Sequence, residues 1–135
     1  MTTSVQVHQK YKPFWLNTFT TASLAAVANV AIYYGTAALS LFQTELVVSS
    51  LGSPIPVGLV AMASVTSILI AAGLKQLLAR FTSNHQRWFL LISLLVLASS
   101  FVAPLTIPGA SISMKASLSA MHIVGGVIAI TRLNR

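Results

Sequence analysis

The residues best suited to chemistry are two polar side chains that lie near the middle of long apolar stretches, His122 and Asn29. An imidazole in such surroundings can relay protons, bind a ligand or hydrogen-bond to a neighbouring helix. A carboxamide has a similar choice between contact with a ligand and a hydrogen bond between helices. We favour the structural interpretation, in which these two side chains bond to each other, and retain ligand binding as the alternative.

Further polar residues share these two stretches. Spacings of three and four residues place Lys115, Ser119 and His122 along one face of a helix. Tyr33 follows Asn29 by about one helical turn, and its hydroxyl needs a partner if it is buried. The sequence therefore predicts a candidate polar site made of Asn29, Tyr33, Lys115, Ser119 and His122.

One acidic residue, Glu45, stands against eight basic ones. Glu45 and Lys115 lie at joins between apolar stretches that belong on the same side of the molecule, so we expect them to pair across two loops. An exposed ion pair contributes about 0–1 kcal/mol, which makes this pair a modest part of the architecture. A gate, or a charge partner for a ligand, is the functional alternative.

Several kinds of site are excluded or disfavoured by the residue types present. Without cysteine, the chain has no disulfide, iron–sulfur cluster or thiolate zinc site. One histidine and no acid within the apolar stretches provide neither bis-histidine haem ligation in one chain nor a nucleophile–base pair. We therefore expect no cofactor, no metal and no enzymatic activity. Pairing of His122 with its copy in a dimer is the remaining route to a haem.

Composition predicts an integral membrane protein. The 135 residues are 56% hydrophobic and 7% charged, whereas a soluble domain carries about 25% charged residues. The net charge of +7 would suggest nucleic acid in a soluble protein. Here the basic residues lie at the ends of apolar stretches, where anionic lipid headgroups are the natural partner, so we expect no nucleic-acid partner.

The apolar stretches are separated by short polar or proline-rich segments, and a helix that crosses a bilayer needs about 20 residues. We predict an all-α integral membrane four-helix bundle with short loops, adjacent helices antiparallel, as one domain over residues 1–135. The first span is expected to be retained rather than cleaved as a signal. The expected spans are about 14–42, 57–78, 88–102 and 112–130.

The basic residues predict the orientation of these spans. Cytoplasmic segments of membrane proteins carry an excess of Lys and Arg, and three patches here alternate with segments that are nearly free of them. Both termini are therefore expected in the cytoplasm, in a bacterial inner membrane. The three patches are Lys10 with Lys12, then Lys75 with Arg80 and Arg87, then Arg132 with Arg135.

Small residues mark the expected helix contacts. Ala63, Ser67 and Ala71 are four residues apart, a ladder that lets helix backbones approach closely in lipid. Gly125 and Gly126 offer a second place of close approach. We predict both sets to be helix-packing positions.

Further residues and short motifs lie inside the first span, at the ends of the spans and inside the last one. They are Asn29, 56–58, 78–82, Trp88, Ser100 with 104–105, Lys115, and 118–122 with its Leu-x-x-Met-His pattern. From about Ala22 to Leu133 the arrangement resembles a family of small bacterial membrane proteins catalogued only as a domain of unknown function. The resemblance implies no activity. It raises the importance of Asn29 and His122.

Two functions remain in competition. The first is a non-enzymatic accessory or scaffold subunit of a membrane complex, which short loops and few ionisable groups favour. The alternative is an oligomeric small-molecule transporter or channel that uses the polar face around Asn29 and His122. Small proton-coupled exporters need an acid inside the first span, and Asn29 takes that place here.

Overall fold

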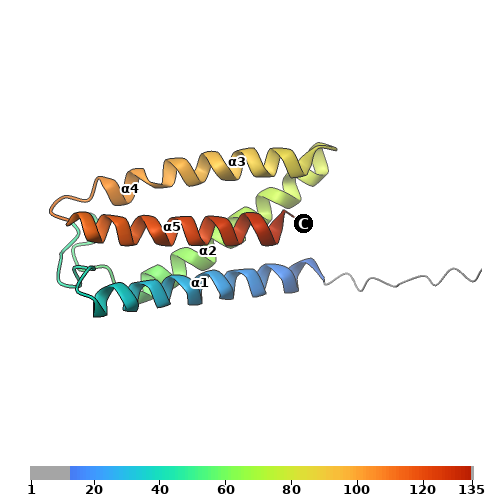
Figure 1. Cartoon of the computed structure of the whole chain (residues 1–135). Coiled ribbons are helices and arrows are strands. Elements are labelled where there is room, and N and C mark those ends of the chain that lie inside the picture. Colours follow the sequence, from blue (N-terminus) through green and yellow to red (C-terminus); the bar gives the residue numbers. More distant parts are fainter. Residues whose placement is uncertain (1–12, 135) are drawn as a thin grey trace, which may run out of the picture.

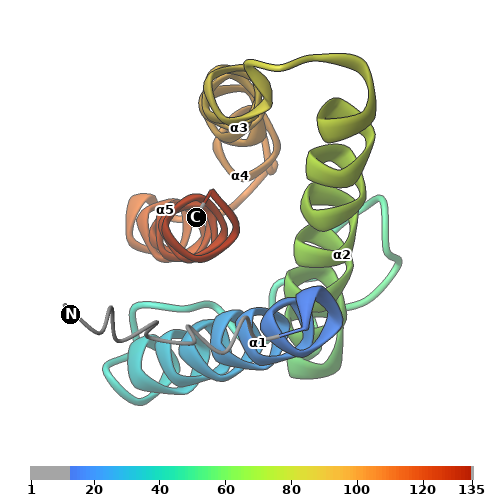
Figure 2. The same cartoon turned by 90° about the vertical axis from the view of Figure 1, so that its right-hand side faces the viewer.

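The computed structural model describes residues 13–134, and all of its long elements are helices. Lys10, Lys12 and Arg135 lie outside these residues. The long helices pack side by side as an antiparallel bundle, and α2 crosses it diagonally (Figures 1 and 2). The all-α prediction is confirmed. The helices are α1 (Phe14–Ala38), α2 (Val57–Phe81), α3 (His85–Ser100), the short α4 (Val102–Leu105) and α5 (Ile112–Leu133).

Helix α1 ends at Ala38, earlier than the expected residue 42. Ser40 takes a left-handed conformation with φ of 56°. Its N–H donates to Ala37 O at 2.9 Å, and the Leu41 N–H donates back to Thr36 O at 2.8 Å. These two bonds form a Schellman cap, which stops the helix and satisfies its last carbonyl groups.

The third span, formed by α3 and α4 together, extends beyond the expected range of 88–102 at both ends. Its first turn includes His85, and after Phe101 the chain continues as α4 to Leu105. Pro104 has no N–H for the carbonyl of Ser100, so the regular α-helical ladder is interrupted there. The Leu105 N–H bonds to Phe101 O at 3.2 Å and resumes the helix.

Helix α1 presents polar side chains to its neighbours without leaving their hydroxyls unpaired. Thr18 donates to Phe14 O at 3.0 Å and Thr21 donates to Asn17 O at 2.6 Å, and both threonines are buried. The other buried positions of α1 are Ala22, Ala25, Asn29 and Tyr33. This inward stripe follows helical spacing. Helix α1 packs against α2 and α5, and Figure 2 shows it beside both.

The buried stripe of α2 differs from the predicted ladder. Ala63 and Ser67 are exposed, and Ala71 is only partly buried. All three residues are small enough for a helix contact. They lie one residue along the chain from the buried row, however, and therefore on a neighbouring face of α2. The row that packs consists of Val60, Ser64, Ile68 and Ala72.

Within residues 13–134, three helical segments are long and apolar enough to cross a membrane: Val57–Phe81, His85–Leu105 and Ile112–Leu133. Helix α1 has the same 25-residue length as α2 but is not among them. It carries no charge; its Thr, Ser, Asn and Tyr residues lower its hydropathy. The protein is therefore a multi-span membrane protein with four long helices, of which three qualify as spans by composition.

Two apolar clusters hold the bundle together. One lies toward the end of the molecule where α5 finishes and includes Ala25, Ala72, Phe89 and Leu133. The other lies toward the loops that connect α1 to α2 and α4 to α5, and it includes Tyr33, Val60, Met114 and Met121. Asn29 and Ser64 lie between the two clusters along the helices.

Candidate functional site

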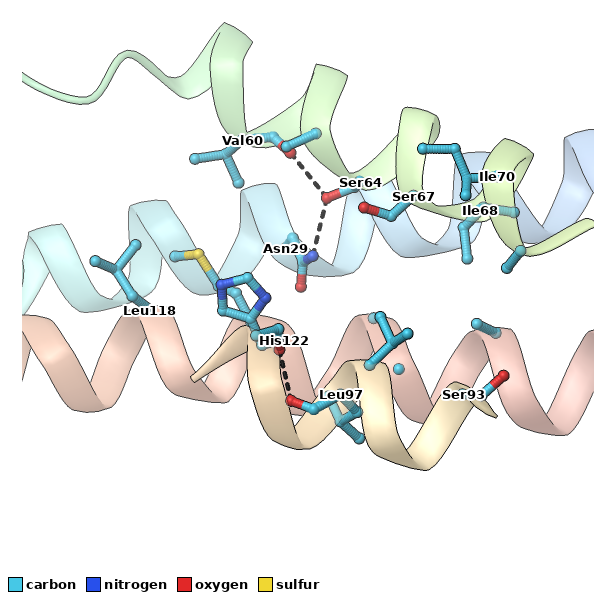
Figure 3. A pocket seen from close by; sticks show the side chains of 18 of the residues that line it. Asn29, Val60, Ser64, Ser67, Ile68, Ile70, Ser93, Leu97, Leu118 and His122 are labelled. Atoms are coloured by element: carbon cyan, nitrogen blue, oxygen red, sulfur yellow. Dashed lines mark hydrogen bonds between the residues drawn. The ribbon is translucent and has the colours of Figure 1, made fainter. Parts of the chain in front are cut away.

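A cavity of about 430 Å³ lies between α1, α2, α3 and α5 (Figure 3). Its volume falls within the range of about 300–1,000 Å³ that small-molecule sites occupy. Most of the wall is apolar. The polar side chains in it are Asn29, Ser64, Ser67, Ser93, Ser100 and His122.

Asn29 reaches the cavity from α1 and is only 6% exposed. Its Nδ2 donates to Ser64 Oγ at 2.9 Å, and the Ser64 hydroxyl donates to Val60 O at 2.8 Å. The single hydroxyl proton is used on Val60, so Ser64 Oγ must accept from the amide nitrogen. This chain of bonds fixes the orientation of the amide and turns Asn29 Oδ1 away from α2.

Asn29 Oδ1 is buried and has no hydrogen-bond partner among the residues that the structure describes. In Figure 3 this oxygen points into the space between α2 and α5. An unpaired buried acceptor costs about 1–3 kcal/mol relative to a satisfied one. Such an atom on the wall of a cavity is a ready contact for a hydrogen-bond donor that the chain itself does not supply.

His122 lines the cavity from α5, opposite Asn29 (Figure 3). The imidazole is partly buried. The predicted bond between His122 and Asn29 is absent from the described part of the chain: Asn29 Nδ2 donates to Ser64 instead, and Asn29 Oδ1 has no partner there. Asn29 and His122, which the sequence analysis singled out, both line this cavity, whereas Ser64, which orients the Asn29 amide, was missed.

Gly125 and Gly126 form the backbone side of the wall. A Cβ atom on Gly125 would lie 3.5 Å from Asn29 Nδ2, and one on Gly126 would lie 2.9 Å from the tip of Leu97. The missing side chain of Gly126 lets α5 lie close to α3, whereas a Cβ on Gly125 would make an ordinary contact with Asn29 of α1. The structure thus places both glycines at helix contacts and, at the same time, in the cavity wall.

The family comparison agrees with the resemblance carried by the sequence. The profile of a family described as "Family of unknown function (DUF6069)" matches residues 9–135. The chain belongs to this family. No match was found among curated proteins or among solved structures.

In this DUF6069 protein, the other predicted polar residues do not reach the cavity. Tyr33 is buried, but its hydroxyl donates to Ile55 O at 3.1 Å and its ring packs on Phe42 with centroids 4.8 Å apart. Lys115 and Ser119 are partly buried and lie off the lining face of α5. That face follows helical spacing through Leu118, His122, Gly125 and Ala129, so Ser119 is displaced sideways from it.

The predicted ion pair between Glu45 and Lys115 does not form within residues 13–134. Glu45 is exposed, and the loops are joined instead by Gln43, whose Oε1 accepts from the Ser111 N–H at 2.6 Å. The two loops do meet, as expected. The neutral amide makes the contact because it reaches an N–H at the start of α5 that has no helical partner.

Two side chains at the other end of the bundle cap α5 and were missed from the sequence. Asn17 Nδ2 donates to Arg132 O at 3.1 Å, and Lys75 Nζ donates to Leu133 O. The last carbonyls of a helix have no partner within it, so donors from neighbouring helices satisfy them. These bonds tie α1 and α2 to the end of α5.

The mouth of the cavity lies between α2 and α3. Helix α2 starts beside α1 and crosses toward the start of α3, so α2 and α3 separate with distance from their shared turn (Figures 1 and 2). The exposed residues of the wall come from these two helices, whereas Asn29 and Met121 are deeply buried. Those exposed residues are Leu59, Ala63, Ser67, Ile70 and Val96.

Proposed function

We propose that this DUF6069 protein is a non-enzymatic transporter of a small molecule, which it binds within the bilayer in the cavity between its four long helices. The buried and unpaired Asn29 Oδ1 on the cavity wall is the observation that supports this function. A subunit needed only for scaffolding gains nothing from an unpaired acceptor beside a cavity, whereas a binding protein gains affinity and selectivity from it. His122 supplies a second polar group across the same space.

The proposed transporter has both termini in the cytoplasm of a bacterial cell and all four long helices in the inner membrane. The end of α2, the start of α3 and the end of α5 lie at one end of the bundle (Figure 1). Arg80, Arg87 and Arg132 are exposed there. A single basic end supports the orientation, because cytoplasmic ends carry the excess of Lys and Arg and face anionic headgroups. Reporter fusions after Arg135 and within 80–87 are expected to be active only as cytoplasmic reporters.

An accessory subunit of a larger membrane complex is the second candidate. The exposed small residues Ala63 and Ser67 favour it, because a helix of a partner could approach closely along this part of α2. The same residues form part of the cavity mouth, so a partner helix and a small molecule would compete for one place.

Native mass spectrometry of the protein extracted with its surrounding lipid separates the two functions. The wild type is compared with Ser67→Trp, which puts a large ring into the mouth, and with Thr66→Trp, an exposed neighbour outside the cavity wall. A homo-oligomer whose bound small molecule is lost in Ser67→Trp alone supports transport. A second polypeptide lost in Ser67→Trp alone supports the accessory role. The transporter is rejected if neither substitution changes what is bound.

A further inference from the structure

We infer that the cavity takes a neutral lipophilic molecule with one hydroxyl or N–H group, and that this molecule enters sideways from the bilayer between α2 and α3. The inference rests on the proposed function, since it names the ligand class of the same cavity. Three properties of the wall lead to it: its acceptor, its lack of charge and the position of its mouth.

The acceptor decides which polar group the ligand carries. Asn29 Nδ2 donates to Ser64 Oγ, and the Ser64 hydroxyl donates to Val60 O. This part of the wall therefore has an unused acceptor atom and no unused donor atom. The unused lone pairs belong to Asn29 Oδ1, which is buried and unpartnered in the described chain. A ligand that donates a hydrogen bond satisfies this oxygen, and a ligand that only accepts leaves it unpaired.

The lack of charge decides that the ligand is neutral. None of the described residues that line the cavity is an Asp, Glu, Lys or Arg. A charged group at membrane depth is costly unless it is paired, and this wall has no fixed counter-ion for either sign. A hydroxyl or neutral N–H group avoids that cost and still uses the Asn29 oxygen.

The position of the mouth decides how the ligand arrives. Leu59 and Ile70 of α2 and Val96 of α3 stand exposed around the opening, and both helices have the composition of membrane spans. An opening on the side of such spans faces lipid chains rather than water. The deeper wall is also mostly apolar and includes Ile68 and Met121, so the body of the ligand is apolar.

The test uses two isomers, 1-dodecanol and 1-methoxyundecane, which share an alkyl body but differ in the ability to donate. Binding of each to the full-length protein in lipid nanodiscs is measured by native mass spectrometry. We expect the wild type to bind the alcohol about tenfold more tightly than the ether, and Asn29→Leu to bind both about equally. The two isomers partition differently into lipid, but that difference is the same for the wild type and Asn29→Leu. It cancels when the alcohol-to-ether affinity ratios of these two proteins are compared.

Three controls make the result decisive. Ser67→Trp is expected to remove binding of both isomers, and Thr66→Trp to leave it unchanged, which locates the probes in the cavity. Circular dichroism and size-exclusion chromatography of Asn29→Leu check that its fold is intact. Dodecyltrimethylammonium, a permanent cation with a similar body, is expected to bind at least tenfold more weakly than the alcohol.

The outcomes separate the ligand class from the function. Equal wild-type affinity for alcohol and ether, with both lost in Ser67→Trp, overturns the ligand class but leaves a small-molecule cavity. Preferential binding of the cation overturns the ligand class in the same way. If no probe binds and no co-purified small molecule depends on Ser67, both the ligand class and the proposed function fail.

Discussion

Asn29 of α1 donates from its Nδ2 to the hydroxyl of Ser64 in α2 over 2.9 Å, and this bond joins the two helices between their apolar clusters. Each partner has a second task. Ser64 also donates to the backbone of its own helix, and Asn29 presents its oxygen to the cavity. The same bond is therefore part of the packing and part of the site.

Ser64→Ala is expected to destabilise the protein more than Asn29→Leu. Alanine leaves the whole buried amide of Asn29 without partners, which costs about 1–3 kcal/mol, whereas leucine has a similar volume and removes the amide together with its unpaired oxygen. The free energies of unfolding of the two variants and their double mutant in detergent give the coupling. We expect about 0.6–1.7 kcal/mol, the range of hydrogen bonds between membrane helices. A coupling near zero would contradict the bond.

Gly126→Ala is expected to be less stable than Gly73→Ala by about 1 kcal/mol or more. Both glycines are inside helices, where alanine is favoured by about 0.5–1 kcal/mol. A Cβ on Gly73 meets nothing within 4 Å, so the gain is kept, whereas one on Gly126 falls 2.9 Å from Leu97. Overpacking of this kind opposes the gain. Thermal denaturation of both variants in the same detergent checks the difference, and equal midpoints would show that Leu97 moves aside freely.

Ser40→Gly is expected to stabilise the protein by about 0.5–1 kcal/mol. Ser40 holds the left-handed position of the cap at the end of α1, with φ of 56°. A residue with a Cβ is strained there by about 1–2 kcal/mol, and glycine is not, although glycine loses more entropy on folding. The free energy of unfolding tests this, with the exposed Ser49→Gly as control. A loss of stability in Ser40→Gly would show that the left-handed cap does not form.

Asn17→Leu is expected to loosen the end of α5. The variant leaves Arg132 O without its donor and costs about 0.5–1.5 kcal/mol, the usual net value of one such bond. Hydrogen exchange of the last turn of α5 should speed up, while exchange in the middle of that helix should not change. Thr20→Leu, an exposed substitution one turn along α1, is the control. Unchanged exchange in Asn17→Leu would argue against this cap.

The number and approximate position of the helices could be predicted from the sequence because membrane helices need long apolar runs and prolines mark several of their ends. The helix ends that were predicted wrongly depend on single backbone groups. The cap at Ser40 shortened α1, and Pro104 interrupted the third span without ending it. Propensity alone describes neither effect.

The faces of the helices were harder to predict than their positions. Ala63, Ser67 and Ala71 have the spacing of a packing ladder, but so has the row from Val60 to Ala72 that is actually buried. In an apolar helix both rows satisfy the same pattern, since lipid and protein interior accept the same side chains. Ser64 gave a usable signal, because a serine in the middle of a span that faces an asparagine on the next helix gains a hydrogen bond.

Helix α3, described along its whole length, has one buried residue, Phe89, which is completely enclosed close to the turn with α2. Every other side chain of this helix is at least partly accessible. The elements of a protein with the fewest buried contacts are those that move at the lowest free-energy cost. Phe89 therefore anchors α3 near its turn with α2. We expect a small rotation of α3 about Phe89 to change the width of the cavity mouth most at the other end of the helix. The apolar contacts of α1 with α2 and α5 can remain intact throughout such a rotation.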